Sequence, residues 1–526
     1  MLKCTFLHIP GVGYKTERRF WNRRIYSWND FFESYNKVDI SQKVAARISR
    51  WLVASEKALK KGDISFFAKK LPKREWWRLY PELKEQMAFL DIETTGLSFY
   101  YDDITMIGIF DGDRVKTFIQ GQNLDDFKSE IKKYSLLVTY NGALFDLRFI
   151  RDKLGQKFIP PFHIDLRFLL KRLGYTGGLK NVETRLGINR NEEISDISGF
   201  DATVLWNRYV RGDDYALKLL AKYNTADIVN LKALLEFSCL RLRNSLLENV
   251  GEHHFDFNVP KINVDIQRKD DSLLELRING SKPILINPEI NRIKLIIIDD
   301  LLPYVSKKKR YPRVVGIDLS GSEKRNTGWA LLEGKHIQTD LLKTDEEIIE
   351  TTAKANPDLI SIDSPLSLPR GRDCTKDSCK CRRFGIFRKA ERTLRSRGVY
   401  VFPSLIRSMQ SLTERGIRMR KEFERRGFSV IESYPGAAQD ILRIIRKKVS
   451  LEDLKQGLKN VGLIGEFVNK KNSHDELDAI TSALVGYFYL SGKYEALGSQ
   501  DEGYLIIPKI DKKLGFSSHL EFSALL

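Results

Sequence analysis

The chain has 526 residues, of which 42% are hydrophobic and 30% are charged. This length predicts two to four domains, and the hydrophobic content excludes a disordered chain. The formal net charge of +19 favours a polyanionic partner, and we expect that partner to be nucleic acid, either DNA or RNA.

No apolar run in the sequence is long enough to span a bilayer, and the first residues lack the pattern of a signal peptide. Five cysteines in a chain of this size do not make a disulfide framework. We therefore expect a soluble, cytoplasmic protein without a membrane partner, and the sequence does not predict its oligomeric state.

Residues 1–38 form the first expected module. The segment HIPGVGYK at 8–15 precedes a basic aromatic helix and resembles the hairpin of a helix-hairpin-helix unit. The resemblance implies phosphate binding by the backbone at Gly11 and Gly13, with Lys15 beside it. A helical turn without a ligand is the alternative.

Residues 39–84 are expected to be a basic helical linker. Its segment KREWWR contains Trp76 and Trp77. These two rings are candidates for base stacking, and a docking surface is the alternative.

Residues 85–245 alternate apolar strands with helical periods, which predicts a mixed α/β domain. The expected strands are MAFLDI, ITMIGIF and SLLVTY, and the expected helices are FDLRFIRDKLG and DDYALKLLAKYNTADIVNLKALLEF.

Five polar residues of this domain are expected to meet at one point. Asp91 and Glu93 are separated by one residue at a strand end, so both side chains point to one face. Asp146 begins a helix, and Tyr223 and Asp227 lie four apart on another. Buried carboxylates need cations, so the cluster predicts bound metal.

Such a cluster is equipped for phosphodiester cleavage with two metal ions. Two Mg²⁺ or Mn²⁺ ions about 4 Å apart would activate water and stabilise the leaving oxygen. Tyr223 would hold or deprotonate the attacking water.

In order, D-x-E at Asp91, N-x-x-x-F-D ending at Asp146 and Y-x-x-x-D at Tyr223 resemble the motifs of DEDDy 3′–5′ exonucleases, within the ribonuclease-H-like superfamily. Lys222 stands where the DEDDh subgroup has histidine. With the N-terminal hairpin, residues 5–245 are similar to a family of predicted bacterial and archaeal exonucleases.

Three further residues near this cluster are candidate functional residues. His163 and Asp165, in HIDL, are candidates for support of the metal ligands, although a structural histidine is favoured. Asn141 is a candidate nucleic-acid contact, although a role in fixing a turn is favoured.

Residues 246–311 are expected to be a connector with short strands, as in KPILIN and KLIIID, and the basic segment SKKKRYPR at 306–313 marks a boundary. A second α/β domain is expected over 312–492, and a C-terminal tail over 493–526. The two α/β domains are candidates for distant structural repeats, although they share no obvious sequence repeat.

The second domain repeats the carboxylate pattern. Asp318, Asp363 and Glu432 each lie at a strand end, while Asp475 and Asp478 lie three apart on the final helix. These acids are expected at one edge of a sheet, the usual place for an α/β site. We expect Asp318, Asp363 and Asp478 to be metal ligands and Asp475 to be a further catalytic residue.

The motifs GID, IDSPL, a YP pair after Glu432 and the terminal D-x-x-D-A resemble domain-of-unknown-function family 429, a family of predicted ribonuclease-H-like nucleases. D-x-x-D-A is also similar to Holliday-junction resolvases of the RuvC type. The resemblance implies a metal-dependent nuclease over 312–490. Two alternatives are a degenerate fold used for binding and a sugar-kinase-like ATPase, but the second phosphate loop that a kinase needs is not found.

Three cysteines, Cys374, Cys379 and Cys381, cluster in a basic insertion. They are able to bind Zn²⁺ with a fourth ligand from elsewhere, but the spacing is not a paired C-x-x-C. Free thiols or a redox pair are favoured. The following RRFGIFRKAERTLRSRG predicts either a phosphate clamp or a solvated amphipathic helix.

Together these patterns predict an α/β protein with two ribonuclease-H-like domains and a small N-terminal helical module. The expected function is a nuclease that removes nucleotides from 3′ ends, with a second head that cuts or binds. The competing hypothesis is a nucleic-acid-binding scaffold in which one or both nuclease folds are inactive.

Overall fold

The computed structural model describes residues 1–80, 82–195, 197, 199–247, 255, 257, 259–270, 272–279, 281–291, 298–305, 310–447 and 450–509. The chain forms two compact units, one of Met1–Thr95 and Asp103–Arg292 and one of Gly96–Asp102 and Ile293–Leu526. No helix within the described ranges is long and apolar enough to cross a membrane. Residues 294–297 of the expected strand KLIIID and residues 306–309 of the expected linker lie outside these ranges.

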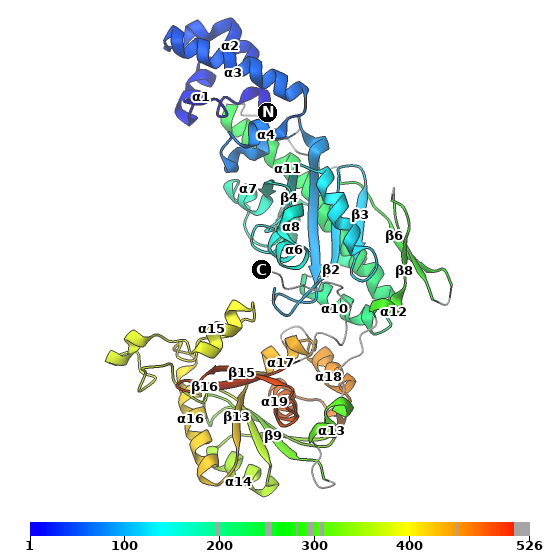
Figure 1. Ribbon diagram of the computed structural model, residues 1–526, viewed down its shortest axis with the longest axis vertical. Coiled ribbons are helices and arrows are strands. Elements are labelled where there is room, and N and C mark those ends of the chain that lie inside the picture. Colours follow the sequence, from blue (N-terminus) through cyan, green and yellow to red (C-terminus); the bar gives the residue numbers. More distant parts are fainter. Residues whose placement is uncertain are drawn as a thin grey trace, which may run out of the picture. The chain divides into compact units, whose positions relative to one another are not determined.

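The N-terminal part of the first unit is helical (Figure 1). Its elements are η1 (Leu2–Cys4), α1 (Tyr14–Asn22), α2 (Trp28–Ser34), η2 (Tyr35–Lys37), α3 (Gln42–Lys60), α4 (Ile64–Ala68), η3 (Lys73–Leu79) and η4 (Lys84–Gln86). A buried ionic cluster joins its two ends, because Arg78 contacts both Glu17 and Glu75 at 2.8 Å. Buried charges persist only when they are paired, so this cluster fixes η3 onto α1.

The glycine-rich segment 8–13 lies between η1, a turn of three residues, and α1. Gly11 has a φ of +84°, and a Cβ there would lie 2.9 Å from Nη2 of Arg47. Gly13 caps α1 with extended backbone. The element before the segment is thus a short 3-10 turn rather than a helix, and phosphate binding by the segment stays a prediction.

Trp76 and Trp77 are buried, with 7% and 1% of their surface exposed. The Trp76 indole N–H donates to the Ala68 carbonyl at 2.9 Å, and its ring packs edge-on against Phe162. Base stacking on these rings is therefore wrong, because both side chains are buried and the ring of Trp76 packs against Phe162 of the sheet.

The first unit contains a five-stranded sheet in the order β3-β2-β1-β4-β5. Its strands are β1 (Met87–Thr94), β2 (Ile104–Phe110), β3 (Val115–Ile119), β4 (Leu136–Thr139) and β5 (Phe162–Asp165). β1, β2 and β3 are antiparallel neighbours, whereas β1, β4 and β5 run parallel. A smaller antiparallel sheet comprises β6 (Val264–Arg268), β7 (Leu274–Ile278) and β8 (Ile284–Ile286).

The helices of this unit carry three of the expected site residues, Asp146, Tyr223 and Asp227. They are α5 (Phe127–Glu130), α6 (Asp146–Leu154), α7 (Leu166–Arg172), α8 (Leu179–Leu186), α9 (Glu192–Ser195), α10 (Gly199–Val210), α11 (Asp214–Leu247) and α12 (Pro288–Asn291), with short turns η5 (Leu124–Asp126), η6 (Ile131–Lys133) and η7 (Gln156–Phe158). The 34-residue α11 packs along β1 and β2.

The second unit contains an eight-stranded sheet in the order β14-β11-β10-β9-β12-β13-β16-β15. Its strands are β9 (Arg313–Asp318), β10 (Thr327–Glu333), β11 (His336–Leu342), β12 (Leu359–Asp363), β13 (Val430–Ser433), β14 (Ile464–Gly465), β15 (Tyr494–Ser499) and β16 (Gly503–Pro508). β9, β10 and β11 are antiparallel neighbours, and β9, β12 and β13 run parallel. The core order therefore repeats that of the first unit.

Helices cover both faces of this sheet. They are α13 (Leu302–Val305), α14 (Asp345–Ala355), α15 (Lys389–Ser396), α16 (Gln410–Arg425), α17 (Pro435–Ile441), α18 (Leu451–Asn460) and α19 (His474–Leu490), with turns η8 (Ile298–Asp300), η9 (Lys380–Phe384) and η10 (Glu466–Val468). α19 packs on one face, whereas α14 and α16 share a core with the other. Mixed sheets flanked by helices in both units confirm the expected α/β class.

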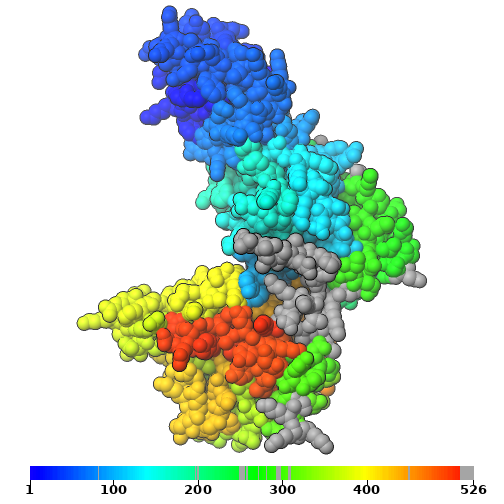
Figure 2. Space-filling view, in the orientation of Figure 1, coloured from blue at the N-terminus to red at the C-terminus, as the bar shows by residue number. Residues whose placement is uncertain are grey.

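β15 and β16 extend the sheet into the region expected to be a tail. β16 pairs in parallel with β13, and β15 closes the edge against it. Leu497, Leu505 and Ile507 share a buried cluster with α15. Figure 2 shows these two strands, in red, in one continuous surface with the yellow segment that contains α15. Leu505 to Pro508 of β16 are all buried, and within the expected tail only residues 510–526 lie outside the described part.

Two glycines let the final helix of the second unit approach the sheet. A Cβ at Gly316 on β9 would lie 2.1 Å from the Ala479 carbonyl oxygen, and one at Gly328 on β10 would lie 2.0 Å from that of Asp475. Glycine inside a strand commonly marks such a close approach of another backbone. α19 thus rests directly on the β9–β10 pair.

We expect Gly328→Ala to destabilise the second unit by about 1–3 kcal/mol, because the new methyl group overlaps backbone that cannot rotate away. Thermal unfolding should show this as a lower transition temperature for that unit. Gly321→Ala is the matched control, since its Cβ would meet its nearest neighbour at an ordinary 3.5 Å. An equal loss in both variants would contradict the close approach.

Candidate active sites in the two units

The first acidic cluster is built by β1 and α11. Asp91 and Glu93 alternate along β1 and share a face, and Asp227 comes from α11. One carboxylate oxygen from each of these three residues lies within 4.8 Å of the others. The structure thus brings together three acids, of which the first and the last are 136 positions apart in the sequence.

Asp146 and Asn224 fix the position of this cluster. Asp146 is the first residue of α6, and its Oδ1 accepts a hydrogen bond from the Ile92 N–H at 3.1 Å. Asn224 donates from Nδ2 to Oδ2 of Asp91 at 3.0 Å. Asp146 therefore joins the expected group, and Asn224 is a residue that the motifs did not indicate.

Burial and mutual repulsion disfavour ionisation of these acids. Burial raises the pKa of Asp91 and of Glu93 well above the ordinary range, and Asp227 raises both further. Burial raises the pKa of Asp146 to about 7. Burial also raises the pKa of Asp227 to about 6, although the Arg190 guanidinium opposes this. Without cations, the cluster therefore opposes folding at neutral pH.

Arg190 is a second residue that sequence motifs missed. Its Nη2 lies 2.5 Å from Oδ1 of Asp227, and its Nε donates to Glu183 at 2.6 Å. Asn230 donates to the same Glu183 carboxylate. Burial lowers the pKa of Arg190, but the charges of Asp227 and Glu183 outweigh this and raise it. Arg190 therefore holds Asp227 in place as a permanent cation.

Tyr223 lies beside this ion pair. The guanidinium carbon of Arg190 is 5.2 Å from the centre of the Tyr223 ring, which is 7% exposed. Burial raises the pKa of the phenol, and Asp227 and Glu93 raise it further, so its hydroxyl keeps its proton. The preceding Lys222 instead forms an ion pair with Glu193.

The loop before α6 is held by Asp165. Its carboxylate accepts hydrogen bonds from the N–H groups of Asn141 at 2.8 Å and Ala143 at 3.1 Å. Asn141 adopts a φ of +67°, the left-handed region that asparagine tolerates, so it does fix the turn. His163 bonds Thr139 at 2.8 Å, and burial lowers its pKa to about 4. These contacts make His163 and Asp165 structural supports of the loop.

The second acidic cluster lies at the ends of β9 and β12. Asp318 and Asp363 are direct neighbours in the parallel register, and Asp478 reaches them from α19. Their carboxylate oxygens lie within 4.8 Å of one another. Burial and the charges of Asp363 and Asp478 raise the pKa of Asp318 well above the ordinary range. Burial and Asp478 raise that of Asp363 to about 8.

Lys447 places a positive charge in this cluster. Its Nζ lies 2.5 Å from Oδ2 of Asp478 and 3.9 Å from Oδ2 of Asp318. Gln439 donates to the other oxygen of Asp478 at 2.8 Å. Lys447 lies outside every motif of the sequence, and a lone lysine in a basic segment gave no signal.

Asp475 and Glu432 do not join the three close carboxylates. Asp475 contacts His474 at 2.8 Å, although its charge still raises the pKa of Asp318. Glu432 is bound by both Nη atoms of Arg388, at 2.7 and 2.6 Å, and by the Leu366 N–H at 2.7 Å. A carboxylate with this many donors has little capacity left for a metal ion.

The first cluster fits divalent metal ions on its own chemistry. Carboxylate oxygens are the ligands that Mg²⁺ and Mn²⁺ prefer. Among the described residues, the buried Oε1 of Glu93 has no hydrogen-bond partner, although buried oxygens normally have one. A cation at this point would satisfy Glu93 and relieve the repulsion of its neighbours. In the second cluster, the three negative charges of the ionised carboxylates exceed the one positive charge of Lys447, so this cluster also fits a cation.

Comparison with known proteins gives a family match within the first unit. Residues 88–238 match the family model described as the RNase_H superfamily. This segment begins at β1 and ends within α11, so it contains Asp91, Glu93, Asp146, Tyr223 and Asp227. A search of curated proteins finds no match to the chain.

Several solved structures are similar to parts of the chain at low identity. NrnC of Brucella melitensis with bound Mg²⁺ is 16% identical over 30% of this chain and 75% of that one, with a TM-score of 0.21. RNase D of Escherichia coli, an exoribonuclease involved in structured RNA processing, is 16% identical over 31% and 43%, with a TM-score of 0.22. The family B DNA polymerase of Pyrobaculum calidifontis is 13% identical over 81% and 54%, with a TM-score of 0.25. On the family match, residues 88–238 form a ribonuclease-H-like domain.

Proposed function

We propose that the first unit is a metal-dependent 3′–5′ exonuclease of the DEDDy type, acting on DNA or RNA. The observation that supports this most strongly is the convergence of Asp91, Glu93 and Asp227 within 4.8 Å, from two elements that are distant in sequence. The order of the motifs supports this reaction, and the family match supports a ribonuclease-H-like nuclease in general.

Each residue would have a defined part in this reaction. Asp91, Glu93, Asp146 and Asp227 would bind two Mg²⁺ or Mn²⁺ ions, which supply a nucleophilic water and stabilise the leaving oxygen. The protonated phenol of Tyr223 would hold and orient that water. Arg190 would act as a positioning residue, because it binds Asp227 and is itself held by Glu183.

We also propose that the second unit is a metal-dependent nuclease that cuts within nucleic-acid chains. Asp318, Asp363 and Asp478 would bind the metal ion, and Asp475 would contribute negative charge beside them. Lys447, which contacts Asp478, would bind the scissile phosphate in the metal-loaded site.

One observation favours a second candidate function for this unit. Lys447 already offsets part of the charge of Asp478 and Asp318, as would be expected of an inactive fold that only binds nucleic acid. The proposal for the first unit includes contacts with nucleic acid outside the acidic cluster. The glycine-rich segment with Gly11, Gly13 and Lys15 would bind phosphates of the substrate, and Asn141 would face the substrate from its turn.

We expect Asp91→Asn and Asp227→Asn to lower metal-dependent 3′ degradation by at least about 100-fold, because each variant removes a charged ligand. The substrates are 5′-labelled DNA and RNA oligonucleotides, digested with Mg²⁺ or Mn²⁺. Shortening from the 3′ end gives a ladder of labelled products, whereas attack from the 5′ end releases labelled mononucleotides. Asp125→Asn is the matched control, because Asp125 is 93% exposed in the same unit. Undiminished digestion by both site variants would overturn the assignment.

Metal binding to the first unit can be measured separately from activity, as a change in its unfolding temperature. In an Asp318→Asn/Asp478→Asn background, Mg²⁺ or Mn²⁺ should raise the transition of the first unit, since cations relieve the repulsion among its buried acids. Glu93→Gln should weaken the apparent metal affinity about 10-fold or more. The same stabilisation in Glu93→Gln and in its parent would show that the metal binds elsewhere.

Cleavage by the second unit is tested in a variant whose first acidic cluster is inactivated. In an Asp91→Asn background we expect residual metal-dependent cutting of circular substrates, which have no 3′ end, and cutting of branched substrates at internal positions. Asp318→Asn should abolish it, whereas Asp340→Asn, at an exposed position on β11, should not. If no substrate is cut in the Asp91→Asn background but binding persists, the binding role holds for this unit.

A further inference from the structure

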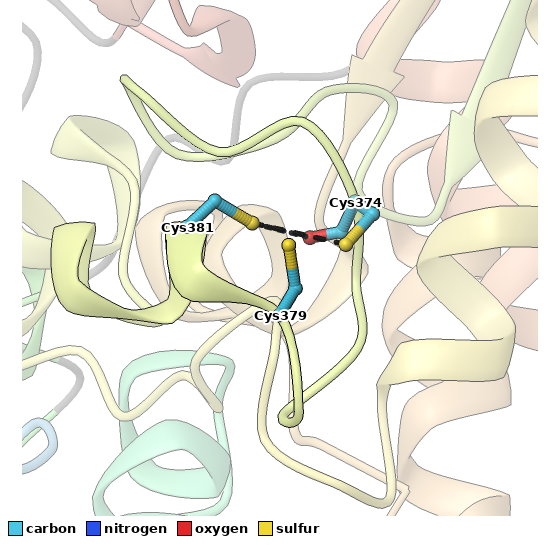
Figure 3. Close-up of side chains that lie close together, drawn as sticks. All are labelled: Cys374, Cys379 and Cys381. Carbon is cyan, nitrogen blue, oxygen red and sulfur yellow. Dashed lines mark hydrogen bonds between the residues drawn. The ribbon is translucent and has the colours of Figure 1, made fainter.

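The insertion between β12 and α16 contains three cysteines whose sulfur atoms point toward one another (Figure 3). Cys374 lies on one side of the loop, and Cys379 and Cys381 lie at the start of η9. All three Sγ atoms lie within 4.8 Å of one another, and Sγ of Cys374 is 3.7 Å from that of Cys381. This group is separate from both acidic clusters.

The distance between these sulfur atoms distinguishes two kinds of chemistry. A disulfide requires about 2.05 Å between sulfurs, so the 3.7 Å between Cys374 and Cys381 is far too long for one. Two thiolates on one tetrahedral zinc ion, each with a Zn–S bond of about 2.3 Å, stand about 3.8 Å apart. The observed spacing fits two thiolates on one zinc ion, and two hydrogen-bonded reduced thiols also stand at this distance.

The rest of the insertion has little else to hold its shape. Residues 370–387, all of them described, contain only one 3-10 turn, and their buried side chains are Arg372, Thr375 and Cys381. Figure 2 shows this yellow-green segment projecting from the rest of the second unit. Segments without an apolar core need another stabilising link, such as a bound metal ion or a disulfide. A metal held by these cysteines would supply it.

A buried positive charge beside the cysteines is opposite in sign to the charge of a zinc ion bound by three thiolates. Arg372 is 5% exposed and donates to the carbonyl groups of Cys374 at 3.1 Å and Lys376 at 3.3 Å. Its Nη1 has no hydrogen-bond partner among the described residues. A Zn²⁺ ion with three thiolates carries a net negative charge, which would balance the buried guanidinium.

We propose that Cys374, Cys379 and Cys381 bind one structural zinc ion that orders the basic insertion of the second unit, with solvent at the fourth coordination position. Binding releases the thiol protons, and no oxidation step is involved. The zinc ion would hold η9, and with it Arg382, Arg383 and the half-exposed Phe384, in one arrangement. The proposal is independent of the two nuclease sites.

The test measures metal in the full-length chain. Protein purified with zinc in the growth medium should contain about one zinc ion per chain after exchange into excess Mg²⁺, which displaces zinc from carboxylates. Cys374→Ser and Cys381→Ser should lower the zinc content about 10-fold or more. Cys4→Ser is the control, because Cys4 lies in the other unit and should leave the content unchanged. A zinc content unchanged in both serine variants, or no zinc in the wild type, would overturn the proposal.

Two further measurements use the wild-type protein and therefore test the proposal even if a serine variant fails to fold. Mercurial modification of thiols in the wild type should release zinc in step with the loss of the three cysteines, followed with a zinc indicator. Cobalt substitution should give the thiolate-to-cobalt charge-transfer absorption that carboxylate sites lack. Iron with acid-labile sulfide in place of zinc would contradict the assignment, as would a disulfide between any two of the three.

Discussion

Both sites depend on the close approach of a helix to an antiparallel pair of strands at a glycine. Asp91 on β1 lies opposite Gly108 on β2, and a Cβ there would lie 2.1 Å from Oδ1 of Asn224 on α11. Asp318 on β9 lies opposite Gly328 on β10, where a Cβ would meet α19 at 2.0 Å. In each unit the first acid therefore has a glycine as its partner. Without that space the helix with the last acid would stand too far away for the carboxylates to meet.

Close approach creates an electrostatic problem that the two units solve differently. In the first, Arg190 binds Asp227 from within a network that includes Glu183, so the cation is itself neutralised and cannot enter the centre of the cluster. In the second, the more exposed Lys447 reaches between Asp478 and Asp318 from a flexible side chain. A rigid guanidinium suits a positioning role, whereas a mobile ammonium can yield its place to a metal ion or a phosphate.

The sequence predicted the strands and helices that carry the acids, because their apolar periodicity is strong and the motifs lie at their ends. Asp91, Glu93 and Asp227 meet as expected, as do Asp318, Asp363 and Asp478. Arg190 and Lys447 could not be predicted, since nothing local distinguishes one basic residue from 87 others in the chain. The burial of Trp76 and the pairing of β16 with β13 were missed for a related reason, because both depend on partners distant in sequence. Glycine inside the strands at 108 and 328 was the available but unused signal for the helix approach.

The contacts of Glu432 explain why the second unit is not a simple copy of the first. The insertion leaves the sheet after Asp363 and returns through Arg388, which forms a two-pronged ion pair with Glu432. Glu432 lies on β13, beside the strand that ends at Asp363. Because breaking a buried pair of this kind costs about 3–5 kcal/mol, the root of the insertion and the acidic edge move together. The Glu432 carboxylate thus anchors the basic insertion next to the three acids of the cluster.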